Sequence, residues 1–359
     1  MSNKSSSSDG ASNIDTSGER AAKVGELLGM REFWSGQILH AGVKLGVFEL
    51  LSDAPLAADA VADELGLEPA YCYRLLRALA SLEVLETHDD RRFALSAVGE
   101  LLQADHPDSL RDDVLFWRSP EYLRSALHLP AIISEGGTSG FAREFGCTIF
   151  EYAEQNRAFG AVFNGSQATP SQWMTPLVLG AFDAYEFGRV SHLCDVGGGH
   201  GHTLCHLLAE HAHLEGTVVH LPNVIDTEPD HWAGRLGVTD WCQYVVGDMF
   251  QTVPRADAYL LKFILHDWPD SECIEVLSTV REAAPKHCRV FVIERLVPED
   301  GRSLAVTRAD IEMMAVNDAR ERTEAAYQSL AEQAGWEFVQ TRTQQDETLS
   351  VIELRMADA

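Results

Sequence analysis

The chain has 359 residues and 45% of them are apolar, so it exceeds the usual size of one hydrophobic core and we expect two compact units. Its formal net charge is −27, from 28 basic and 55 acidic residues, and such a surface repels the phosphate backbone of nucleic acids. No stretch reaches the roughly 18 apolar residues of a membrane helix and the N-terminus is too polar for a secretory signal, so we expect a soluble, cytoplasmic protein without a membrane partner.

The acidity itself has two explanations, attraction of a cationic partner or adaptation of the surface to a salty cytosol. The cysteines are scattered without a CxxC pair, and their odd number fits free buried thiols better than a disulfide framework. They are Cys72, Cys147, Cys194, Cys205, Cys242, Cys273 and Cys288. We therefore expect neither a zinc site nor any other metal.

Residues 1–18 are rich in Ser, Asp and Gly and are expected to form a disordered tail. Residues 19–110 are predicted to be a mainly helical winged-helix domain. The predicted elements of the winged helix are a helix at 57–65, a turn at Gly66, a helix at 68–82, and strands at 84–87 and 93–95. Ahead of them an apolar stripe, formed by Trp34, Ile38, Leu45 and Phe48, would be partly exposed in one subunit, so we expect a homodimer.

Residues 111–185 read as helical and aromatic, and we expect them to form a lid and linker. The aromatic residues are Phe116, Trp117, Tyr122, Phe141, Phe150, Tyr152, Phe159, Phe163 and Trp173. Ordinary core packing is the expected role of most of them, and only a few can line a ligand pocket.

From residue 186 to 359 the pattern alternates between strand and helix, which predicts a parallel sheet with helical crossovers. The predicted parallel strands are 190–196, 217–220, 243–247, 256–262 and 289–294. Strands at 337–342 and 348–354 are separated only by a short polar loop, so they must form an antiparallel hairpin. Together they predict an α/β fold with a seven-stranded, Rossmann-like sheet.

A glycine-rich turn, Asp195 to Gly201, follows the first of these strands. Its glycines let the backbone approach a nucleotide-like ligand without a Cβ in the way. Such a turn also serves dinucleotides, but the spacing of Gly197, Gly198, Gly199 and Gly201 does not match GxGxxG. The spacing therefore favours an adenosyl ligand without a pyrophosphate.

Two further motifs follow strands of the sheet. Asp248 and Met249 follow the third strand, where a carboxylate can accept the adenine amino group and a methionine can cover the ring; a plain turn is the alternative. His266 and Asp267 follow the fourth strand, at the sheet edge where α/β folds bind ligands. The alternative there is a helix-entry turn capped by Asp267 or Asp270.

These motifs, with Glu294 in Val-Ile-Glu-Arg and Glu321 in Glu-Arg-Thr-Glu, occur in the order seen in the large O-methyltransferase family, which the chain resembles from about Arg31 to Leu354. That family includes plant caffeate enzymes, acetylserotonin methyltransferase and bacterial enzymes of polyketide metabolism. The resemblance implies a class I methyltransferase sheet, an N-terminal domain that dimerises rather than binding DNA, S-adenosylmethionine as cofactor and a small aromatic acceptor.

The resemblance also implies roles for individual residues. His266 would be the general base that takes the proton of the acceptor hydroxyl, with Glu294 and Glu321 flanking its imidazole. The implied cofactor-binding residues are Asp195, Gly197, Gly199, His220, Asp248, Met249 and Lys262. Glu321 could instead belong, with Glu324, to the acidic start of a helix.

His220 departs from the family pattern, because relatives have an acidic residue there that holds both ribose hydroxyls. A carboxylate accepts from two hydroxyls at once and an imidazole cannot, but Asp226 lies close enough in sequence to replace that carboxylate. The methionine that often follows Phe-Asn in the lid is also absent after Phe163 and Asn164.

Two other functions stay open on the sequence. A homologue of the same fold could catalyse hydroxylation, decarboxylation or a pericyclic step, for which His220 is the supporting feature. A winged-helix transcription regulator would use Arg74, Arg77, Arg91 and Arg92 to face DNA, a small basic footprint in so acidic a chain.

Overall fold

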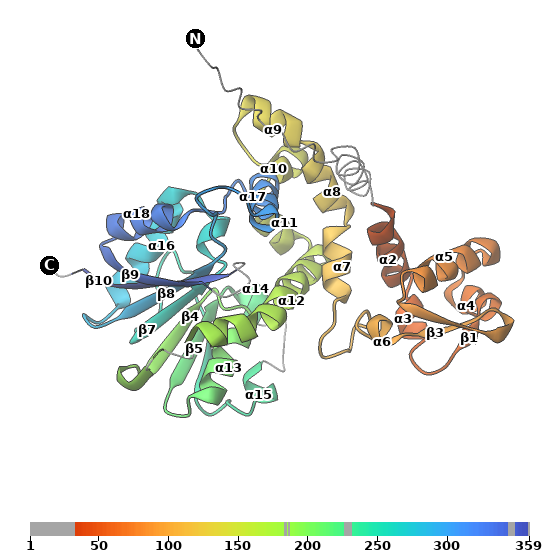
Figure 1. Ribbon diagram of the computed structural model, residues 1–359, viewed down its shortest axis with the longest axis horizontal. Helices are drawn as coiled ribbons and strands as arrows, with labels where there is room; N and C mark the ends of the chain where they lie inside the picture. Colours follow the sequence, from red (N-terminus) through yellow and green to blue (C-terminus); the bar gives the residue numbers. More distant parts are fainter. Residues whose placement is uncertain (1–32, 183–184, 186, 226–231, 344–348, 358–359) are drawn as a thin grey trace, which may run out of the picture. The chain divides into compact units, whose positions relative to one another are not determined.

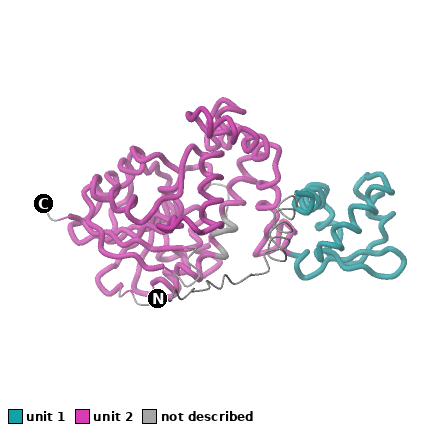
Figure 2. Tube along the Cα trace, turned by 45° about the horizontal axis from the view of Figure 1, so that its top comes forward, with its two compact units in different colours: residues 1–100 teal, residues 101–359 magenta. Residues whose placement is uncertain are grey.

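The chain is described by a computed structural model that covers residues 33–182, 185, 187–225, 232–343 and 349–357. It divides into two compact units, Met1–Glu100 and Leu101–Ala359 (Figure 2). The sequence placed this boundary at residue 110; in the structure residues 101–110 belong to the second unit. The expected tail, residues 1–18, lies outside the described residues.

The first unit has the helix, helix, wing order that the sequence predicted. Its elements are α2 (Trp34–Lys44), α3 (Val47–Leu50), β1 (Leu56–Ala57), α4 (Ala58–Leu65), α5 (Pro69–Ser81), β2 (Leu85–His88), η1 (Asp89–Arg91), β3 (Arg92–Leu95) and α6 (Ala97–Glu100). Gly66 ends α4 in the left-handed conformation that favours glycine, and Pro69 begins α5 after the cap Glu68. The three strands form an antiparallel sheet in the order β1-β3-β2.

The structure removes one residue from the predicted apolar stripe. Phe48 was expected in a stripe that is partly exposed in one subunit, but it is fully buried, as are Leu76, Leu79 and Phe93. The short helix α3 turns Phe48 inward after the left-handed Gly46, which a helical projection continued from α2 does not anticipate. Trp34 remains 70% exposed and Leu45 40% exposed, so part of the stripe does face solvent.

The second unit begins with a helical segment. Its helices are α7 (Arg111–Trp117), α8 (Pro120–Leu127), α9 (Leu129–Glu135), α10 (Gly140–Phe145), α11 (Ile149–Gln155) and the long α12 (Arg157–Phe182). The rings of Phe116, Phe141, Phe159 and Phe163 are buried together and form the core of this segment. These four aromatic residues are therefore packing residues.

An α/β layer follows, which Figure 1 shows as a twisted sheet with helices on both faces. Its strands are β4 (His192–Val196), β5 (Glu215–His220), β6 (Cys242–Val246), β7 (Ala258–Lys262), β8 (Arg289–Glu294), β9 (Trp336–Thr343) and β10 (Ser350–Met356). Its helices are η2 (Phe187–Arg189), α13 (His202–Glu210), α14 (Pro222–Ile225), α15 (Trp232–Arg235), η3 (Leu265–Asp267), α16 (Asp270–Ala283), α17 (Leu304–Val316) and α18 (Glu324–Gln333).

The seven strands have the order β6-β5-β4-β7-β8-β10-β9, which confirms the predicted seven-stranded sheet. The first five are parallel, and β10 pairs antiparallel with both β8 and β9. Leu204 and Leu208 of α13 pack on one face of the sheet, and Val276 and Val280 of α16 on the other. Burial on both faces explains why the central strands β4, β7 and β8 are nearly continuous apolar runs.

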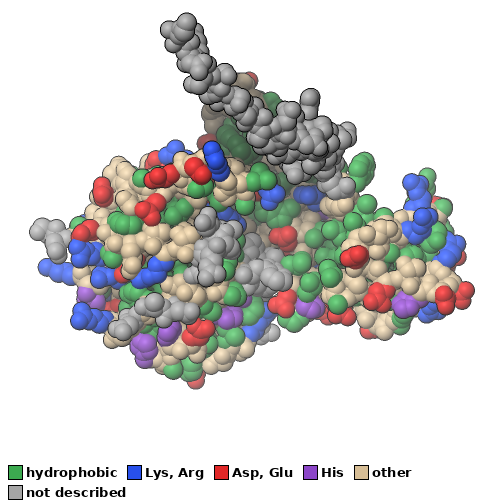
Figure 3. Space-filling model, in the orientation of Figure 1, with side chains coloured by type: hydrophobic (Ala, Val, Ile, Leu, Met, Phe, Trp, Pro, Cys, Tyr) green, Lys and Arg blue, Asp and Glu red, His purple; other side chains and the backbone are tan. Residues whose placement is uncertain are grey.

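The charged side chains are mixed by sign. On the face shown in Figure 3, Asp and Glu side chains lie among the Lys and Arg side chains of both units. On the winged helix, Arg91 lies 3.7 Å from the Tyr73 ring centroid and Arg74 lies 5.7 Å from that of Tyr71. Among the described helices, none combines the length and apolar character needed to cross a bilayer.

Candidate active site

The motif residues meet at one edge of the sheet, because parallel strands all end on the same side. The turn from Gly197 follows β4, and His220 is the last residue of β5. Asp248 follows β6, Lys262 ends β7 and Glu294 ends β8. The structure therefore gathers residues that are up to about a hundred positions apart in the chain along a single edge.

Most positions of the glycine turn have no room for a side chain, and Gly199 is the exception. Gly197, Gly199 and Gly201 have φ angles of 69°, 58° and 81°, in the left-handed region. A Cβ on Gly197 would lie 2.4 Å from Cδ1 of Ile264, and one on Gly201 would lie 2.6 Å from the Tyr244 hydroxyl oxygen. A Cβ on Gly199 would meet no atom within 4 Å, so the turn has open space there.

A buried carboxylate lies beneath this turn. A Cβ on Gly198 would lie 2.4 Å from Cγ of Asp195, and neither carboxylate oxygen of Asp195 has a hydrogen-bond partner among the described residues. Burial raises the pKa of Asp195 to about 7, and the Lys262 cation opposes this rise. Lys262 donates from Nζ to the Ser171 hydroxyl at 2.8 Å. An unpartnered buried carboxylate is stabilised by a neighbouring hydrogen-bond donor or positive charge.

His220 and Asp248 lie further along the same edge. The backbone N–H of Leu221 donates to Nδ1 of His220 at 2.8 Å. The Asp248 carboxylate accepts from the Phe250 backbone N–H and from the Gln251 side chain, both at 3.0 Å. These hydrogen bonds stabilise the turn that follows β6. Met249 is half-buried and packs against the core on the α16 side of the sheet. Asp226, the sequence's substitute for the ribose carboxylate, lies outside the described residues.

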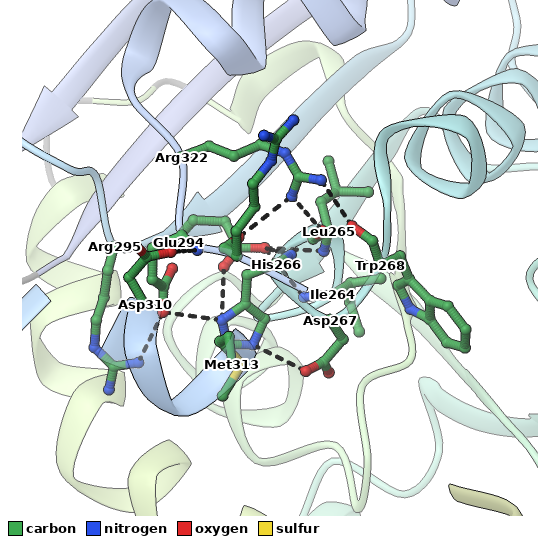
Figure 4. Close-up of polar contacts among 12 residues, drawn as sticks. Ile264, Leu265, His266, Asp267, Trp268, Glu294, Arg295, Asp310, Met313 and Arg322 are labelled. Atoms are coloured by element: carbon green, nitrogen blue, oxygen red, sulfur yellow. Dashed lines mark hydrogen bonds and ion pairs between the residues drawn. The ribbon is translucent and has the colours of Figure 1, made fainter. Parts of the chain in front are cut away.

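His266 lies in a cluster of acidic side chains (Figure 4). Its Nδ1 lies 3.1 Å from Oε1 of Glu321 and 3.9 Å from Oε2 of Glu294, while its Nε2 lies 3.6 Å from Oδ1 of Asp267. Burial opposes protonation of the imidazole, yet Glu294, Asp267 and Glu321 together outweigh it and raise its pKa to about 9. The cluster therefore stabilises a positive charge on the ring.

Glu294 contacts the loop more closely than the imidazole. Its Oε1 accepts from three successive backbone N–H groups, those of Ile264, Leu265 and His266, at 3.2, 3.0 and 3.3 Å. Burial raises the pKa of Glu294 to about 7, although His266 opposes the rise. The sequence predicted that Glu294 would flank the imidazole, and its Oε2 lies 3.9 Å from Nδ1 of His266. Its hydrogen bonds to the loop could not be predicted, because the donors are backbone N–H groups.

Glu321 reaches His266 from the turn that precedes α18. Its backbone N–H donates to Oδ1 of Asp310 at 3.0 Å, and Nη1 of Arg295 lies 3.8 Å from its carboxylate. The helix cap is Thr323, whose side chain accepts from the Ala326 backbone N–H. Glu324 is therefore the acidic residue in the first turn of α18, whereas Glu321 is buried and contacts the His266 imidazole.

Arg322 is a site residue for which the sequence assigned no role. Its guanidinium donates to the carbonyls of Leu265 and Trp268 at 2.8 and 2.7 Å, and to Asp270 at 2.7 and 3.0 Å. Its side chain is 1% exposed. Arg322 thus fixes the backbone on both sides of His266. The only available signal was its position next to Glu321.

The alternative of a helix-entry turn does not describe the two aspartates. The N-cap of α16 is Pro269 and makes no side-chain cap hydrogen bond. Asp267 instead accepts from the Asn317 side-chain amide at 2.6 Å, and Asp270 pairs with Arg320 and Arg322. Both carboxylates therefore serve the loop around His266 rather than the helix.

The spacing of the cluster would also suit a metal ion. Among the described residues, the possible ligand atoms of His266, Glu294 and Glu321 lie within 4.8 Å of one another. In the structure Nδ1 of His266 lies 3.1 Å from Glu321, and the Arg295 cation lies 3.8 Å from the same carboxylate. This arrangement is the one expected for proton chemistry at the imidazole.

One predicted lid aromatic reaches the loop that carries His266. The rings of Phe150 and Trp268 are stacked, with centroids 5.5 Å apart and an interplanar angle of 13°. Both rings are half-buried, and Trp268 also packs edge-on against Phe250 at 4.8 Å. The side chain of Trp173, another lid aromatic, lies outside the described side chains.

Comparison with known proteins gives consistent results over nearly the whole chain. The family profile described as O-methyltransferase domain matches residues 127–337, and that described as O-methyltransferase dimerisation domain matches residues 27–105. Phenazine O-methyltransferase PhzM of Lysobacter antibioticus is 30% identical over 305 residues, covering 85% of this chain and 88% of that protein.

Solved structures agree. The LaPhzM crystal structure superposes with a TM-score of 0.85 at 28% identity and covers 93% of this chain and 99% of that one. The O-methyltransferase NcsB1 of neocarzinostatin biosynthesis, solved with S-adenosyl-L-homocysteine and 1,4-dihydroxy-2-naphthoic acid, superposes with a TM-score of 0.73 at 25% identity and covers 92% of this chain and 98% of that one.

Proposed function

Because the chain belongs to the S-adenosylmethionine-dependent O-methyltransferase family, we propose that it methylates a hydroxyl group of a small aromatic secondary metabolite, with His266 as the general base. The observation that carries the proposal is the 3.1 Å contact between Nδ1 of His266 and Glu321, which leaves Nε2 as the nitrogen that can take a proton. The phenazine and naphthoic acid named for two relatives support an aromatic acceptor.

The sheet edge fits the cofactor. The orphaned carboxylate of Asp195 and the open space at Gly199 suit the amino-acid end of S-adenosylmethionine, whose ammonium group supplies donors and positive charge. Asp248, Met249 and His220 lie where the adenosyl end would extend. Lys262, at the end of β7, donates to Ser171 of α12, and its cation favours the charged form of the Asp195 carboxylate. When bound, S-adenosylmethionine supplies an electrophilic methyl group on a sulfonium ion.

The residues around His266 divide the proton chemistry between them. Nε2 would accept the proton of the acceptor hydroxyl as the oxygen of that hydroxyl takes the methyl group supplied by S-adenosylmethionine. Glu321 accepts from Nδ1–H and so keeps the lone pair on Nε2. Glu294 and Arg322 hold the loop backbone that carries the imidazole. The resulting imidazolium is stabilised by the surrounding carboxylates.

The proposed reaction is tested by incubating the full-length protein with methyl-labelled S-adenosylmethionine and a panel of phenols, quinols and hydroxylated polycyclic aromatics. Label recovered in an alkali-stable ether of one acceptor class supports the proposal. Consumption of an acceptor without label in any product would contradict it and support instead a homologue that catalyses a different reaction on the same fold.

We also propose a homodimer formed through the first unit. The match to the dimerisation domain covers residues 27–105, and Trp34 and Leu45 present apolar side chains to solvent. Sedimentation at micromolar concentration should give a dimer in low and in molar salt, and Trp34→Ser should weaken it more than Tyr71→Ser, an exposed aromatic residue on α5. A wild-type monomer in every buffer would contradict the dimer.

A further inference from the structure

His220 occupies the middle of the proposed cofactor site. It ends β5, which lies between β4 and β6 in the sheet. On one side the backbone N–H of Gly197 donates to the Val219 carbonyl at 2.8 Å, and on the other the N–H of Gly247 donates to the His220 carbonyl at 3.0 Å. A ligand that extends from the glycine turn to Asp248 must therefore cross the end of β5 at His220.

The hydrogen bond to Nδ1 fixes the protonation of this imidazole. A backbone N–H can only donate, so the 2.8 Å contact from Leu221 requires an unprotonated Nδ1. A neutral imidazole without a proton on Nδ1 carries it on Nε2. Burial, with a smaller effect from His200, lowers the pKa of His220 to about 4, in agreement with a neutral ring.

Such a ring offers a ligand one donor and no acceptor. A ribose clasp in an α/β nucleotide site ordinarily uses a carboxylate, which accepts from the ribose hydroxyls. Between His220 and Ile225 the structure describes no acidic residue. The hydroxyl protons of a bound ribose therefore find no carboxylate in this segment.

We propose that His220 is a cofactor-binding residue that binds the ribose as a hydrogen-bond donor through Nε2–H, which reverses the polarity of the usual carboxylate clasp. The proposal rests on the proposed function, because it takes S-adenosylmethionine as the ligand. A ribose oxygen accepts from Nε2, and the hydroxyl protons turn toward solvent or other acceptors. Since the clasp lacks a charge, it makes a weaker contribution to affinity than a carboxylate would.

The first test is calorimetric titration of the full-length protein with S-adenosylhomocysteine. His220→Gln can place an amide N–H near the position of Nε2, so its Kd should stay within about threefold of wild type. His220→Leu removes the donor and should raise Kd about three- to tenfold, the range of one neutral hydrogen bond. Thermal melting of each variant checks that it folds.

The second test reads the tautomer directly. Long-range ¹⁵N–¹H spectra of histidine-labelled protein, with the His220 signals identified by their loss in His220→Gln, should show a proton on Nε2 and none on Nδ1 both with and without S-adenosylhomocysteine. An Nδ1–H or doubly protonated ring in the complex would overturn the proposal, as would a folded His220→Leu that binds like wild type. If wild type itself does not bind S-adenosylhomocysteine, the proposed function fails rather than the polarity of the clasp alone.

Discussion

The Nδ1 atom of His266 lies 3.1 Å from Oε1 of Glu321, a carboxylate whose side chain is fully buried. Glu294 is also fully buried, but its nearest oxygen to the imidazole lies at 3.9 Å and its hydrogen bonds go to the loop backbone. The two carboxylates therefore have different tasks. In the proposed mechanism, Glu321 sets the tautomer of the His266 base, and Glu294 positions the loop that carries it.

Glu321→Gln is expected to shift the pH dependence of acceptor methylation. In the proposed mechanism the neutral imidazole is the active form. We therefore expect kcat/KM for the acceptor to rise with pH up to the pKa of His266, which is about 9 without cofactor and should be lower once the sulfonium cation is bound. Removal of the Glu321 charge destabilises the imidazolium and lowers that pKa, so the rising limb should move to lower pH. The plateau should fall about ten- to a hundredfold, because the base is held less well.

Glu324→Gln is the matched control for this profile. Glu324 lies three positions further along, in the first turn of α18, where it accepts from the Gln328 side chain at 3.1 Å. Its profile should coincide with that of wild type from pH 6 to 10. If the rising limb of the kcat/KM profile keeps its wild-type position in Glu321→Gln, the Glu321 carboxylate does not interact with the His266 base.

Arg322→Met should destabilise the fold more than Arg320→Met. Both arginines bind Asp270, but Arg322 is buried and also satisfies the carbonyls of Leu265 and Trp268, whereas the Arg320 side chain is 58% exposed. Loss of the buried guanidinium leaves buried carbonyls without a donor and should lower the free energy of unfolding by about 2 to 4 kcal/mol. Urea denaturation measures both variants, and equal midpoints for the two would refute the assigned role of Arg322.

Gly199→Ala separates backbone strain from ligand contact. Gly199 and Gly66 both have positive φ, and an added Cβ would meet open space at each, so either alanine should lower the free energy of unfolding by about 1 kcal/mol. Only Gly199 lies in the proposed cofactor site, so only Gly199→Ala should also raise the Kd of S-adenosylhomocysteine, by about tenfold or more. Titration of both variants decides the point, and wild-type affinity in Gly199→Ala would remove this glycine from the site.

Much of the fold follows from local patterns in the sequence. Apolar runs bounded by polar turns located the central parallel strands, because strands buried on both faces exclude most polar residues. The short polar loop between the last two strands located the final hairpin. The sequence also placed Gly197, His266 and Glu294 at strand ends, where a parallel sheet necessarily brings them together. Periodicity failed at Phe48, where a left-handed glycine changes the direction of the chain.

The parts of the site that escaped prediction depend on the backbone. Glu294 binds N–H groups that every residue possesses, so residue types carry no signal for it. Arg322 binds carbonyls more than fifty positions away, and no spacing rule links it to Leu265. The tautomer of His220 likewise depends on one backbone donor, that of Leu221.

The assignment of His266 as general base is tested most directly by His266→Ala, assayed with a confirmed acceptor at saturating S-adenosylmethionine. A positioned base contributes about a hundred to ten thousandfold, so kcat should fall by that factor. The Kd of S-adenosylhomocysteine should stay within about twofold, since the imidazole is assigned to the acceptor and not to the cofactor. A kcat within about threefold of wild type, in a variant that binds the cofactor product normally, would contradict the assignment of His266 as the base.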